Sequence, residues 1–293
     1  MEGLIIKKIA DKFTVYNHSK NLVYNAVARG NLKKENNMLL VGDKVMCSEA
    51  EGEEVIIEKL IPRENVLVRP PIANVDNLII LITKEPAPDL MLVDKLIVQC
   101  NILNIEPIIV ISKLDILDDT FVNDLVEQYK NAVNYIIPLS SKTGEGANRL
   151  IELIKGKTSS LVGQSAVGKS SLINMFGAKM EVGDISVKTK RGKNTTRHTE
   201  IWLFEGGVRL ADTAGFSRFY LSDIKYSTLM RYYNDFIPYA KHCKYSSCVH
   251  IFEKDDECSV KIAKNSGKIN LNRYNRYVVI YNELKKQWSR RYD

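Results

Sequence analysis

The stretch from Gly163 to Ser170 reads GQSAVGKS and fits G-x-x-x-x-G-K-[ST], the consensus of a phosphate-binding loop. Residues 159–162 have the character of a buried strand, and residues 171–176 favour a helix that we expect Gly177 to end. A strand, a glycine loop and a helix N-terminus direct backbone N–H groups and a positive dipole end at one point. The feature therefore predicts an α/β domain with a polyphosphate site.

Two side chains of this loop have predicted roles of their own. We expect Lys169 to reach the β- and γ-phosphates of a nucleotide and Ser170 to hold Mg²⁺. The alternative, a glycine-rich turn that matches by chance, is disfavoured by the flanking strand and helix. The predicted phosphate-cradling residues are Gly163, Gln164, Ser165, Ala166, Val167, Gly168, Lys169, Ser170 and Ser171.

Length and composition indicate a globular protein of several domains. At 293 residues, two or three domains are expected, and 45% hydrophobic with 26% charged residues is ordinary. No run of 18 apolar residues exists, so we expect no membrane span. Residues 1–4 do not begin a signal peptide, which predicts a cytoplasmic protein.

The net charge of +7 is concentrated near the end of the chain. Residues 231–293 carry 13 basic and 7 acidic side chains, whereas residues 1–67 carry 10 of each. Such a patch suits a nucleic-acid surface. A solvated basic helical face would give the same charge, so both interpretations remain open here.

The first 67 residues contain several short β-type runs and no long helical pattern. Five or so short strands in about 65 residues suggest a small barrel such as an OB-fold, which either binds RNA or serves as a plain scaffold. Cys47 is expected to be a small core residue. The candidate strands are Leu4–Ile9, Phe13–Tyr16, Leu22–Ala28, Met38–Leu40, Asp43–Cys47 and Val55–Leu60.

Prolines in a connector, residues 61–71, disfavour regular ladders and helices, which predicts an irregular connector and a domain boundary near residue 68. Beyond it, apolar strand-like runs alternate with helical spacing as far as residue 211, which predicts an α/β sheet with helices on both faces. We therefore divide the chain into residues 1–67, 68–230 and 231–293. The expected strands are 78–83, 107–111, 135–139, 201–204 and 208–211, and the expected helices are 90–100, 121–133 and a third from about 147.

A second phosphate motif, D-x-x-G, spans Asp212 to Gly215. At the end of a strand, Asp212 can hold Mg²⁺ through water and the Gly215 N–H can reach a γ-phosphate. The motif is weak alone but strong some 40 residues beyond a phosphate-binding loop. Between the two lies a polar segment in which Thr195 or Thr196 is expected to complete the Mg²⁺ shell. The predicted catalytic residues are Lys169, Thr195, Thr196, Asp212 and Gly215, with Ser170 and Thr195 as magnesium ligands.

Two short motifs earlier in the chain predict recognition of guanine. Residues 112–115 approximate N-K-x-D, and the carboxylate of Asp115 would accept hydrogen bonds from guanine N1–H and N2–H₂, which adenine lacks. Residues 140–142 approximate S-A-K, a motif whose backbone N–H meets guanine O6. The alternative for Asp115 is a helix N-cap. The predicted base-reading residues are Ser112, Lys113, Asp115, Ser140, Ser141 and Lys142.

The order of these motifs is unusual. An ordinary GTPase places the phosphate-binding loop first and the base-reading motifs last, whereas this chain has the base-reading motifs at 112–115 and 140–142, before the loop at 163–170. The pattern predicts a circularly permuted GTPase domain, because strand positions in space can be kept while the termini move.

The last cluster is Cys243-x₄-Cys248-x-His250-x₇-Cys258, and three thiolates and one imidazole fit a closed tetrahedral Zn²⁺ site. Buried free cysteines are the alternative, and His242 could replace His250. Basic and aromatic residues around the cluster can bind RNA, although most of the aromatics are expected to form the core face of a final helix, Leu271–Trp288. These residues are Lys241, Lys244, Lys254, Lys261, Lys264, Lys268, Arg273, Tyr274, Arg276, Tyr277, Tyr281, Trp288, Arg290 and Arg291.

Taken together, these motifs resemble a known family, the circularly permuted, small-ribosomal-subunit-dependent GTPases of bacteria. The resemblance covers essentially the whole chain. It implies an N-terminal OB-fold, a permuted GTPase domain and a C-terminal zinc domain. It also implies GTP or GDP with Mg²⁺ and one Zn²⁺, and a monomeric factor that binds the 30S subunit and its 16S rRNA late in maturation and is stimulated by that subunit.

Several positions depart from the family's pattern. Ser112 replaces the usual Asn, which predicts the loss of one bracing amide, and Asn194 stands where a histidine is sometimes assigned a catalytic part. Phe216 follows D-x-x-G, where many GTPases carry a Gln that orients the attacking water. Slow intrinsic hydrolysis is therefore expected. A rival hypothesis, an RNA-binding zinc protein with a vestigial nucleotide site, is opposed by the intact Lys169, Ser170 and Asp212.

Overall fold

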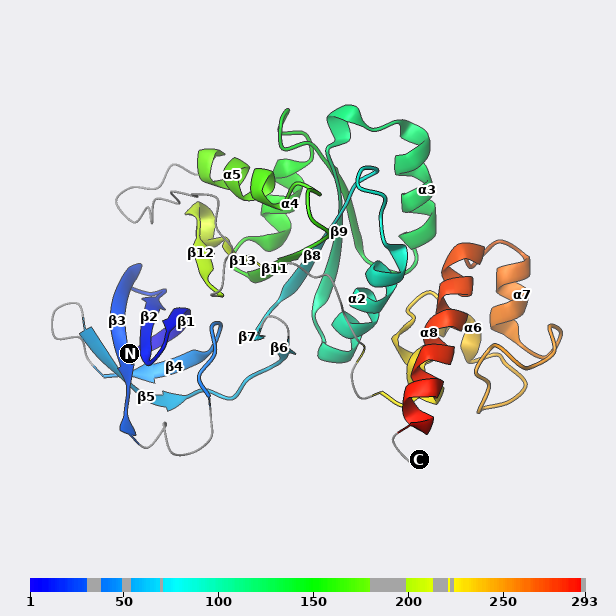
Figure 1. Cartoon of the computed structure of the whole chain (residues 1–293), viewed down its shortest axis with the longest axis horizontal. Helices are drawn as coiled ribbons and strands as arrows, with labels where there is room; N and C mark the ends of the chain where they lie inside the picture. The colour runs from blue at the N-terminus through cyan, green and yellow to red at the C-terminus, as the bar shows by residue number, and fades with distance from the viewer. Residues whose placement is uncertain are drawn as a thin grey trace.

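The computed structural model of the chain describes residues 1–30, 38–48, 54–68, 71–179, 199–212, 221 and 224–290. A small barrel, an α/β unit and a mainly helical C-terminal part follow one another along the chain. The barrel and the helical part lie at opposite ends of the molecule, with the α/β unit between them (Figure 1). This arrangement confirms the predicted fold class, whereas the boundaries at 67 and 230 stay predictions.

The N-terminal barrel is closed. Its strand order is β1-β2-β3-β5-β4, and β4 pairs back onto β1, which is the OB-fold arrangement expected from the sequence. Alternate side chains enter its core, as Val55 and Ile57 do, and Cys47 is a buried core residue as predicted. The strands are β1 Glu2–Ile9, β2 Lys12–Asn17, β3 Leu22–Ala28, β4 Lys44–Cys47 and β5 Glu54–Leu60.

Two predictions for the first 73 residues are wrong. Met38–Leu40 is a loop rather than a strand, because side chains occupy its backbone groups: Asp43 accepts from the Leu40 N–H and Arg63 donates to the Met38 carbonyl. The connector is not irregular throughout, since β6 (Val66–Val68) pairs with β7 (Pro71–Ala73). Pro71 begins its strand, a position where a missing N–H is tolerated.

The central sheet has the order β10-β9-β8-β11-β13-β12, and its strands are parallel except for β12. The four helices in the described part of this unit cover both faces, as predicted. Leu78 and Ile80 of β8 pack with α2 and α3, whereas Ile79 and Leu81 pack with α4 and α5. The strands are β8 Asn77–Ile82, β9 Glu106–Ser112, β10 Tyr135–Leu139, β11 Thr158–Val162, β12 Ile201–Leu203 and β13 Arg209–Asp212.

The helices of this unit agree with the predicted spacing, with two exceptions. α3 ends at Tyr129 rather than at residue 133. Helix α5 continues through Gly177, which therefore does not end it. Cys100 lies on the core face of α2 and is fully buried, as expected. The helices are α2 Leu90–Leu103, α3 Asp119–Tyr129, α4 Ala147–Ile154 and α5 Lys169–Lys179, with short 3-10 turns η1 Leu114–Ile116 and η2 Glu205–Gly207.

The C-terminal part packs against α2 (Figure 1). Tyr274, Tyr277 and Tyr281 are buried on the core face of α8, which confirms the predicted role of the aromatics. Arg273 is fully buried as well, so its expected place among the RNA-facing cations is wrong. The elements are η3 Tyr226–Tyr232, α6 Ile237–Ala240, α7 Ser259–Asn265 and α8 Leu271–Ser289. No helix in the described part of the chain has the length and apolar character to span a membrane.

Candidate functional site

The loop between β11 and α5 has a backbone that glycine makes possible. A Cβ on Gly163 would lie 2.8 Å from the Leu81 carbonyl oxygen, and Gly168 has φ +101°. Lys169 is the first residue of α5, and its Nζ donates to the carbonyl oxygens of Gly163 at 2.6 Å and Gln164 at 2.7 Å. The loop therefore folds around the ammonium that the sequence assigns to the phosphates.

Ser112 braces this loop from the neighbouring strand. Its Oγ lies 2.6 Å from the Val167 carbonyl oxygen and 3.2 Å from that of Ile82, and the side chain is buried. The hydroxyl therefore donates to the phosphate-binding loop from the place of the usual Asn. The bracing amide is absent, as expected, but the shorter Ser112 side chain still reaches a carbonyl of the loop.

The two predicted base-reading motifs meet. Ser140 Oγ donates to Asp115 Oδ1 at 2.7 Å, and this hydrogen bond holds the pKa of the exposed Asp115 carboxyl below its usual range. The Ser140 hydroxyl also accepts from the backbone N–H of Lys142 and of Thr143, which shapes the loop after β10. The N-cap of α3 is Asp118 rather than Asp115, so the capping alternative does not hold.

The sheet topology explains why distant motifs converge. Ser112, Ser140 and Gly163 lie at or just beyond the carboxyl ends of β9, β10 and β11, and Asp212 ends β13. Because these strands are parallel, all four positions lie along one edge of the sheet, where open α/β sheets bind ligands. The predicted residues Thr195, Thr196 and Gly215, with Asn194 and Phe216, lie outside the described residues.

The loop after β8 is a part of the site that sequence reasoning missed. Gln164 Nε2 donates to the Ala87 carbonyl at 3.2 Å, and Gln164 Oε1 accepts from the Asp89 N–H at 3.1 Å. Lys113, in a left-handed backbone conformation, donates from Nζ to the Glu85 carbonyl at 2.9 Å. Residues 84–89 fit no nucleotide consensus, and their only signal is their position after a buried strand of the sheet.

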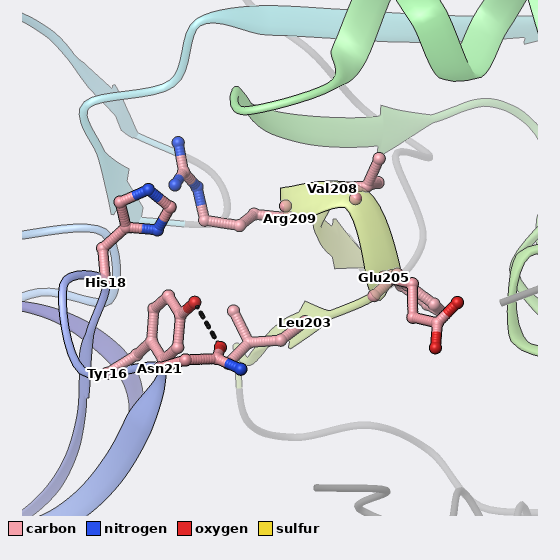
Figure 2. Close-up of a pocket in the computed structure, with 10 residues that line it drawn as sticks. Tyr16, His18, Asn21, Leu203, Glu205, Val208 and Arg209 are labelled. Carbon is pink, nitrogen blue, oxygen red and sulfur yellow. Dashed lines mark hydrogen bonds between the residues drawn. The ribbon is translucent and has the colours of Figure 1, made fainter. Parts of the chain in front are cut away.

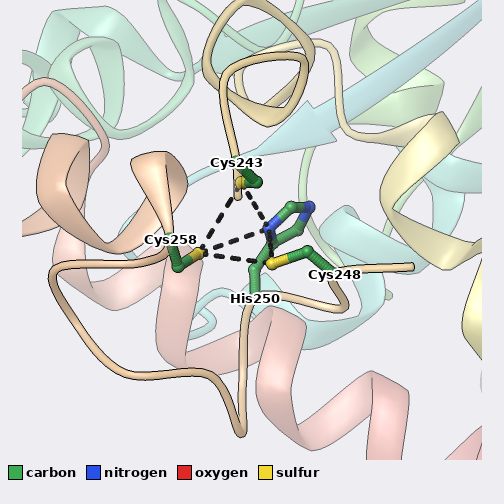
Figure 3. A group of neighbouring side chains, drawn as sticks. All are labelled: Cys243, Cys248, His250 and Cys258. Carbon is green, nitrogen blue, oxygen red and sulfur yellow. Dashed lines mark hydrogen bonds between the residues drawn. The ribbon is translucent and has the colours of Figure 1, made fainter. Parts of the chain in front are cut away.

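The Cys3His group is assembled as the sequence predicts (Figure 3). Cys258 Sγ lies 3.7 Å from Cys248 Sγ and 3.9 Å from Cys243 Sγ, and His250 Nδ1 lies 3.2–3.6 Å from the three sulfurs. Tetrahedral Zn²⁺ with bonds of about 2.3 Å to sulfur and 2.0 Å to nitrogen requires separations of about 3.8 and 3.5 Å. The donor set and its dimensions therefore fit zinc, with His250 rather than His242 as the imidazole.

Burial sets the charge state of this group. It lowers the pKa of His250 to about 4, so the imidazole is neutral and free to act as a ligand near pH 7. Burial raises the pKa of the Cys248 and Cys258 thiols, because a buried thiolate needs a compensating cation. His250 Nε2 is buried and has no hydrogen-bond partner in the described part of the chain, which leaves Nδ1 as the atom aimed at the cysteines.

A separate pocket of about 370 Å³ lies between the barrel and the β12–β13 hairpin. His18 and Tyr16 line it from the barrel, and Arg209 faces them from the hairpin (Figure 2). Tyr16 donates from its hydroxyl to Asn21 Oδ1 at 2.9 Å. The pocket shares no lining residue with the nucleotide loops and lies at the junction between the two units.

Comparisons with known proteins agree with this geometry. The sequence model of the RsgA GTPase family matches residues 60–222, and that of the RsgA N-terminal domain matches residues 2–57. The chain is 39% identical to the small ribosomal subunit biogenesis GTPase RsgA of Ruminiclostridium cellulolyticum over 97% of this chain and 93% of that protein. The corresponding protein of Geobacillus thermodenitrificans is 36% identical over 99% of both chains.

Solved structures show the same architecture. YjeQ from Thermotoga maritima superposes with a TM-score of 0.83 at 31% identity, covering 97% of this chain and 98% of its own. YloQ, described as a circularly permuted GTPase, gives 0.82 at 30% identity, covering 98% of this chain and 95% of its own. These likenesses and the two family matches cover barrel, sheet and nucleotide loops alike. The chain therefore belongs to the RsgA GTPase family.

Proposed function

We propose that the chain hydrolyses GTP and acts in the biogenesis of the small ribosomal subunit. The observation that carries the GTPase part is the meeting of the phosphate-binding loop and both base-reading motifs along one sheet edge, with Ser112 joining the two sets through Val167. The ribosomal part rests on the relatives' described role. The alternative of a vestigial nucleotide site is disfavoured by the intact loop around Lys169.

Each predicted site residue then has a role. Lys169 contacts the β- and γ-phosphates, and the Asp115 carboxylate, kept ionised by Ser140, accepts from guanine N1–H and N2–H₂. The backbone N–H of Ser141 faces guanine O6, whereas that of Lys142 is held by the Ser140 hydroxyl. Mg²⁺ bound with the nucleotide neutralises charge that develops on the phosphates. Its proposed protein ligands are Ser170 and Thr195, with Asp212 acting through water, Thr196 beside them and the Gly215 N–H on the γ-phosphate.

The C-terminal part is proposed to bind one Zn²⁺ and to contact 16S rRNA of the 30S subunit. Its surface supports RNA contact: Phe252 has 66% of its surface exposed, and Lys285 Nζ lies 5.3 Å from the centre of its ring. A base can stack on an exposed aromatic ring while a nearby cation meets the backbone phosphates. We further propose that the protein acts as a monomer in the cytoplasm.

A small subunit bound at the C-terminal part could stimulate hydrolysis through the segment that follows D-x-x-G. Leu221, six positions beyond Gly215, is buried in one hydrophobic cluster with Ile280 and Leu284 of α8. Leu221 is thus anchored in the C-terminal core. Movement of the D-x-x-G motif would therefore bias the C-terminal core, and movement of that core would bias the motif.

Nucleotide turnover with and without purified small subunits tests the proposal. We expect slow release of phosphate from GTP alone, a large increase with small subunits, and no comparable turnover of ATP. Absence of GTP hydrolysis under both conditions would contradict the enzymatic assignment. If large subunits stimulate hydrolysis as well as small subunits do, the proposed role in small-subunit biogenesis is contradicted.

A further inference from the structure

A buried ion cluster joins the GTPase unit to the C-terminal part, and the proposed mechanism does not use it. Asp94 of α2 is fully buried; its Oδ1 accepts from Arg273 Nη1 at 2.8 Å and its Oδ2 from Arg276 Nε at 2.6 Å. Arg273 also donates to Asp235 at 2.7 Å. We call Asp94, Asp235, Arg273 and Arg276 the Asp94 clamp.

The clamp is balanced in charge and fixed in orientation. The carboxylates of Asp235 and Asp94 raise the pKa of Arg273 against the lowering effect of its burial, so the guanidinium stays charged. Tyr129 and Tyr233 lie 5.5 and 4.7 Å from that guanidinium, and Arg276 also reaches Gln128 and Tyr129. A buried cluster of this kind is weak evidence for stability, but planar guanidinium forks define one relative placement of two elements.

The N-terminus of α2, just before Asp94, touches the nucleotide loops. Asp89 is the N-cap of α2, and its backbone N–H donates to Gln164 of the phosphate-binding loop. Just before Asp89, the Ala87 carbonyl accepts a hydrogen bond from Gln164. The Glu85 carbonyl accepts one from Lys113. Both nucleotide-reading loops are therefore hydrogen-bonded to the segment that leads directly into α2.

Asp94 of the clamp and the N-terminus of α2 are close together. From Asp89 to Asp94 the helix rises about 7.5 Å, and α2 contains neither glycine nor proline over its 14 residues. A helix of this length without a kink transmits a tilt or shift from one end to the other. α2 therefore forms a continuous path from the clamp to the hydrogen bond at Gln164.

We propose that Asp94 is a positioning residue for nucleotide turnover: through α2 it couples the placement of the C-terminal part to the phosphate-binding loop at Gln164. This regulation rests on the proposed function, and it gives the C-terminal part a second connection besides the segment around Leu221. Coupling of this kind is reciprocal, so bound nucleotide must in turn alter α8.

Hydrogen exchange on the full, zinc-loaded chain tests the coupling without any ribosome. GDP or a non-hydrolysable GTP analogue should slow amide exchange in α8 of the parent chain by several-fold. Arg276→Met keeps the Asp94–Arg273 pair but removes the contacts to Asp94 Oδ2, Gln128 and Tyr129. It should lose at least half of this response, and Arg276→Lys should regain part of it.

Two further variants make the result specific. Glu283→Gln breaks the Lys95–Glu283 bridge, a more exposed ion pair between the same two helices, and should keep the full response because exposed pairs contribute little. Gln164→Ala breaks the opposite end of the path and should lose the response while the clamp stays intact. The Gln164 variant also decides the matter if Arg276→Met does not fold.

Measurement of GTP turnover is a second test of the coupling. With small subunits, Arg276→Met should lower kcat about 10-fold, within the usual range of coupling between sites, and leave the KM for GTP within about 2-fold. The inference is overturned if nucleotide leaves α8 exchange unchanged in the parent chain, or changes it equally in the parent, Arg276→Met and Gln164→Ala. If small subunits do not stimulate the parent chain, the proposed function is refuted instead. The coupling would then still be tested by the effect of nucleotide on hydrogen exchange in α8.

Discussion

At the scale of single residues, Lys169 Nζ donates to two carbonyl oxygens of its own loop, at 2.6 and 2.7 Å. A nucleotide would replace these neutral acceptors with charged phosphate oxygens, which form stronger bonds. The loop is thus shaped around a charge whose proposed partner is the ligand.

The Lys169→Ala variant should bind GTP and GDP at least about 100-fold more weakly, because charge-assisted bonds to two phosphates are lost. Titration with a fluorescent guanine nucleotide measures the change. Lys155→Ala, in an exposed turn outside the loop, is the control and should bind normally. Normal nucleotide binding by Lys169→Ala would show that the site lies elsewhere.

The Asp115→Asn variant should lose guanine preference and gain affinity for xanthosine nucleotides, because an amide donates where the carboxylate accepted. Ser140 can still donate to the remaining Oδ1, so the loop should keep its shape. Competition among GTP, XTP and ATP measures the preference. We expect GTP to bind at least about 10-fold more weakly. Unchanged GTP affinity would place base recognition at another residue.

The lowered pKa of Asp115 also has a consequence for pH. A carboxyl whose pKa is depressed stays ionised as pH falls through the usual range for Asp, near 4. Guanine preference in the parent chain should therefore be flat from about pH 8 down to about pH 5. A preference lost between those values would show that another titrating group controls it.

At the scale of elements, β9 braces the phosphate-binding loop through one hydroxyl. Ser112→Ala leaves the buried Val167 carbonyl without this donor, at a cost of about 1–3 kcal/mol. Nucleotide affinity should fall several-fold as the loop loses its placement. Ser266→Ala removes a comparable serine-to-carbonyl bond in the C-terminal part and should leave affinity unchanged. Equal affinities for both variants would mean that Ser112 does not position the loop.

The loops around the Cys3His group have little regular structure to hold them. Cys248→Ser should reduce the metal content from about one Zn²⁺ per chain to less than half, with melting confined to the C-terminal part. Mass spectrometry of the intact protein and metal analysis measure both. Cys47→Ser, a buried cysteine of the barrel, should leave zinc content unchanged. A metal-free parent chain of full stability would refute the site.

At the scale of the whole molecule, the barrel and the C-terminal part lie at opposite ends of the GTPase unit (Figure 1). The net charge follows this polarity, since most of the +7 belongs to residues 231–293. Stimulation by small subunits should therefore fall steeply between about 50 and 200 mM salt, as phosphate contacts require. Turnover by the free protein is the control and should change little. Salt-independent stimulation would argue against RNA contact by this surface.

Deletion of the C-terminal part is a poorer test than substitution. A chain cut near residue 230 would lose Arg273 and Arg276 and leave Asp94 as a buried carboxylate without these partners. It would also expose Val98 of α2, which packs in the C-terminal core. Loss of stimulation in such a chain would mix the missing surface with a disturbed α2, so point variants are preferable.

The sequence alone determined the chemistry and the architecture of this protein. Glycines at required backbone positions, a lysine at a helix start and carboxylates after strands are local features, and their spacing and order identified the loops, the permutation and the Cys3His group. The strands and helices of the sheet followed from apolar periodicity. Local errors arose at Met38–Leu40, where the side chains of Asp43 and Arg63 occupy the backbone groups, and at β6–β7, which pair as two short neighbouring strands. A third arose at Gly177, through which α5 continues.

Only the tertiary structure decided how the parts act on one another. Arg273 counts as a surface cation in the sequence and proves to be a buried partner of Asp94, 179 positions away. In the sequence, Ser112 marks only the absence of the usual Asn amide. In the structure, its hydroxyl donates to the Val167 carbonyl and braces the loop. Neither fact is local, because a buried charge or hydroxyl takes its role from whichever group the fold places beside it. Local patterns report which residues can bind a phosphate or a metal, whereas packing determines which helix connects those sites.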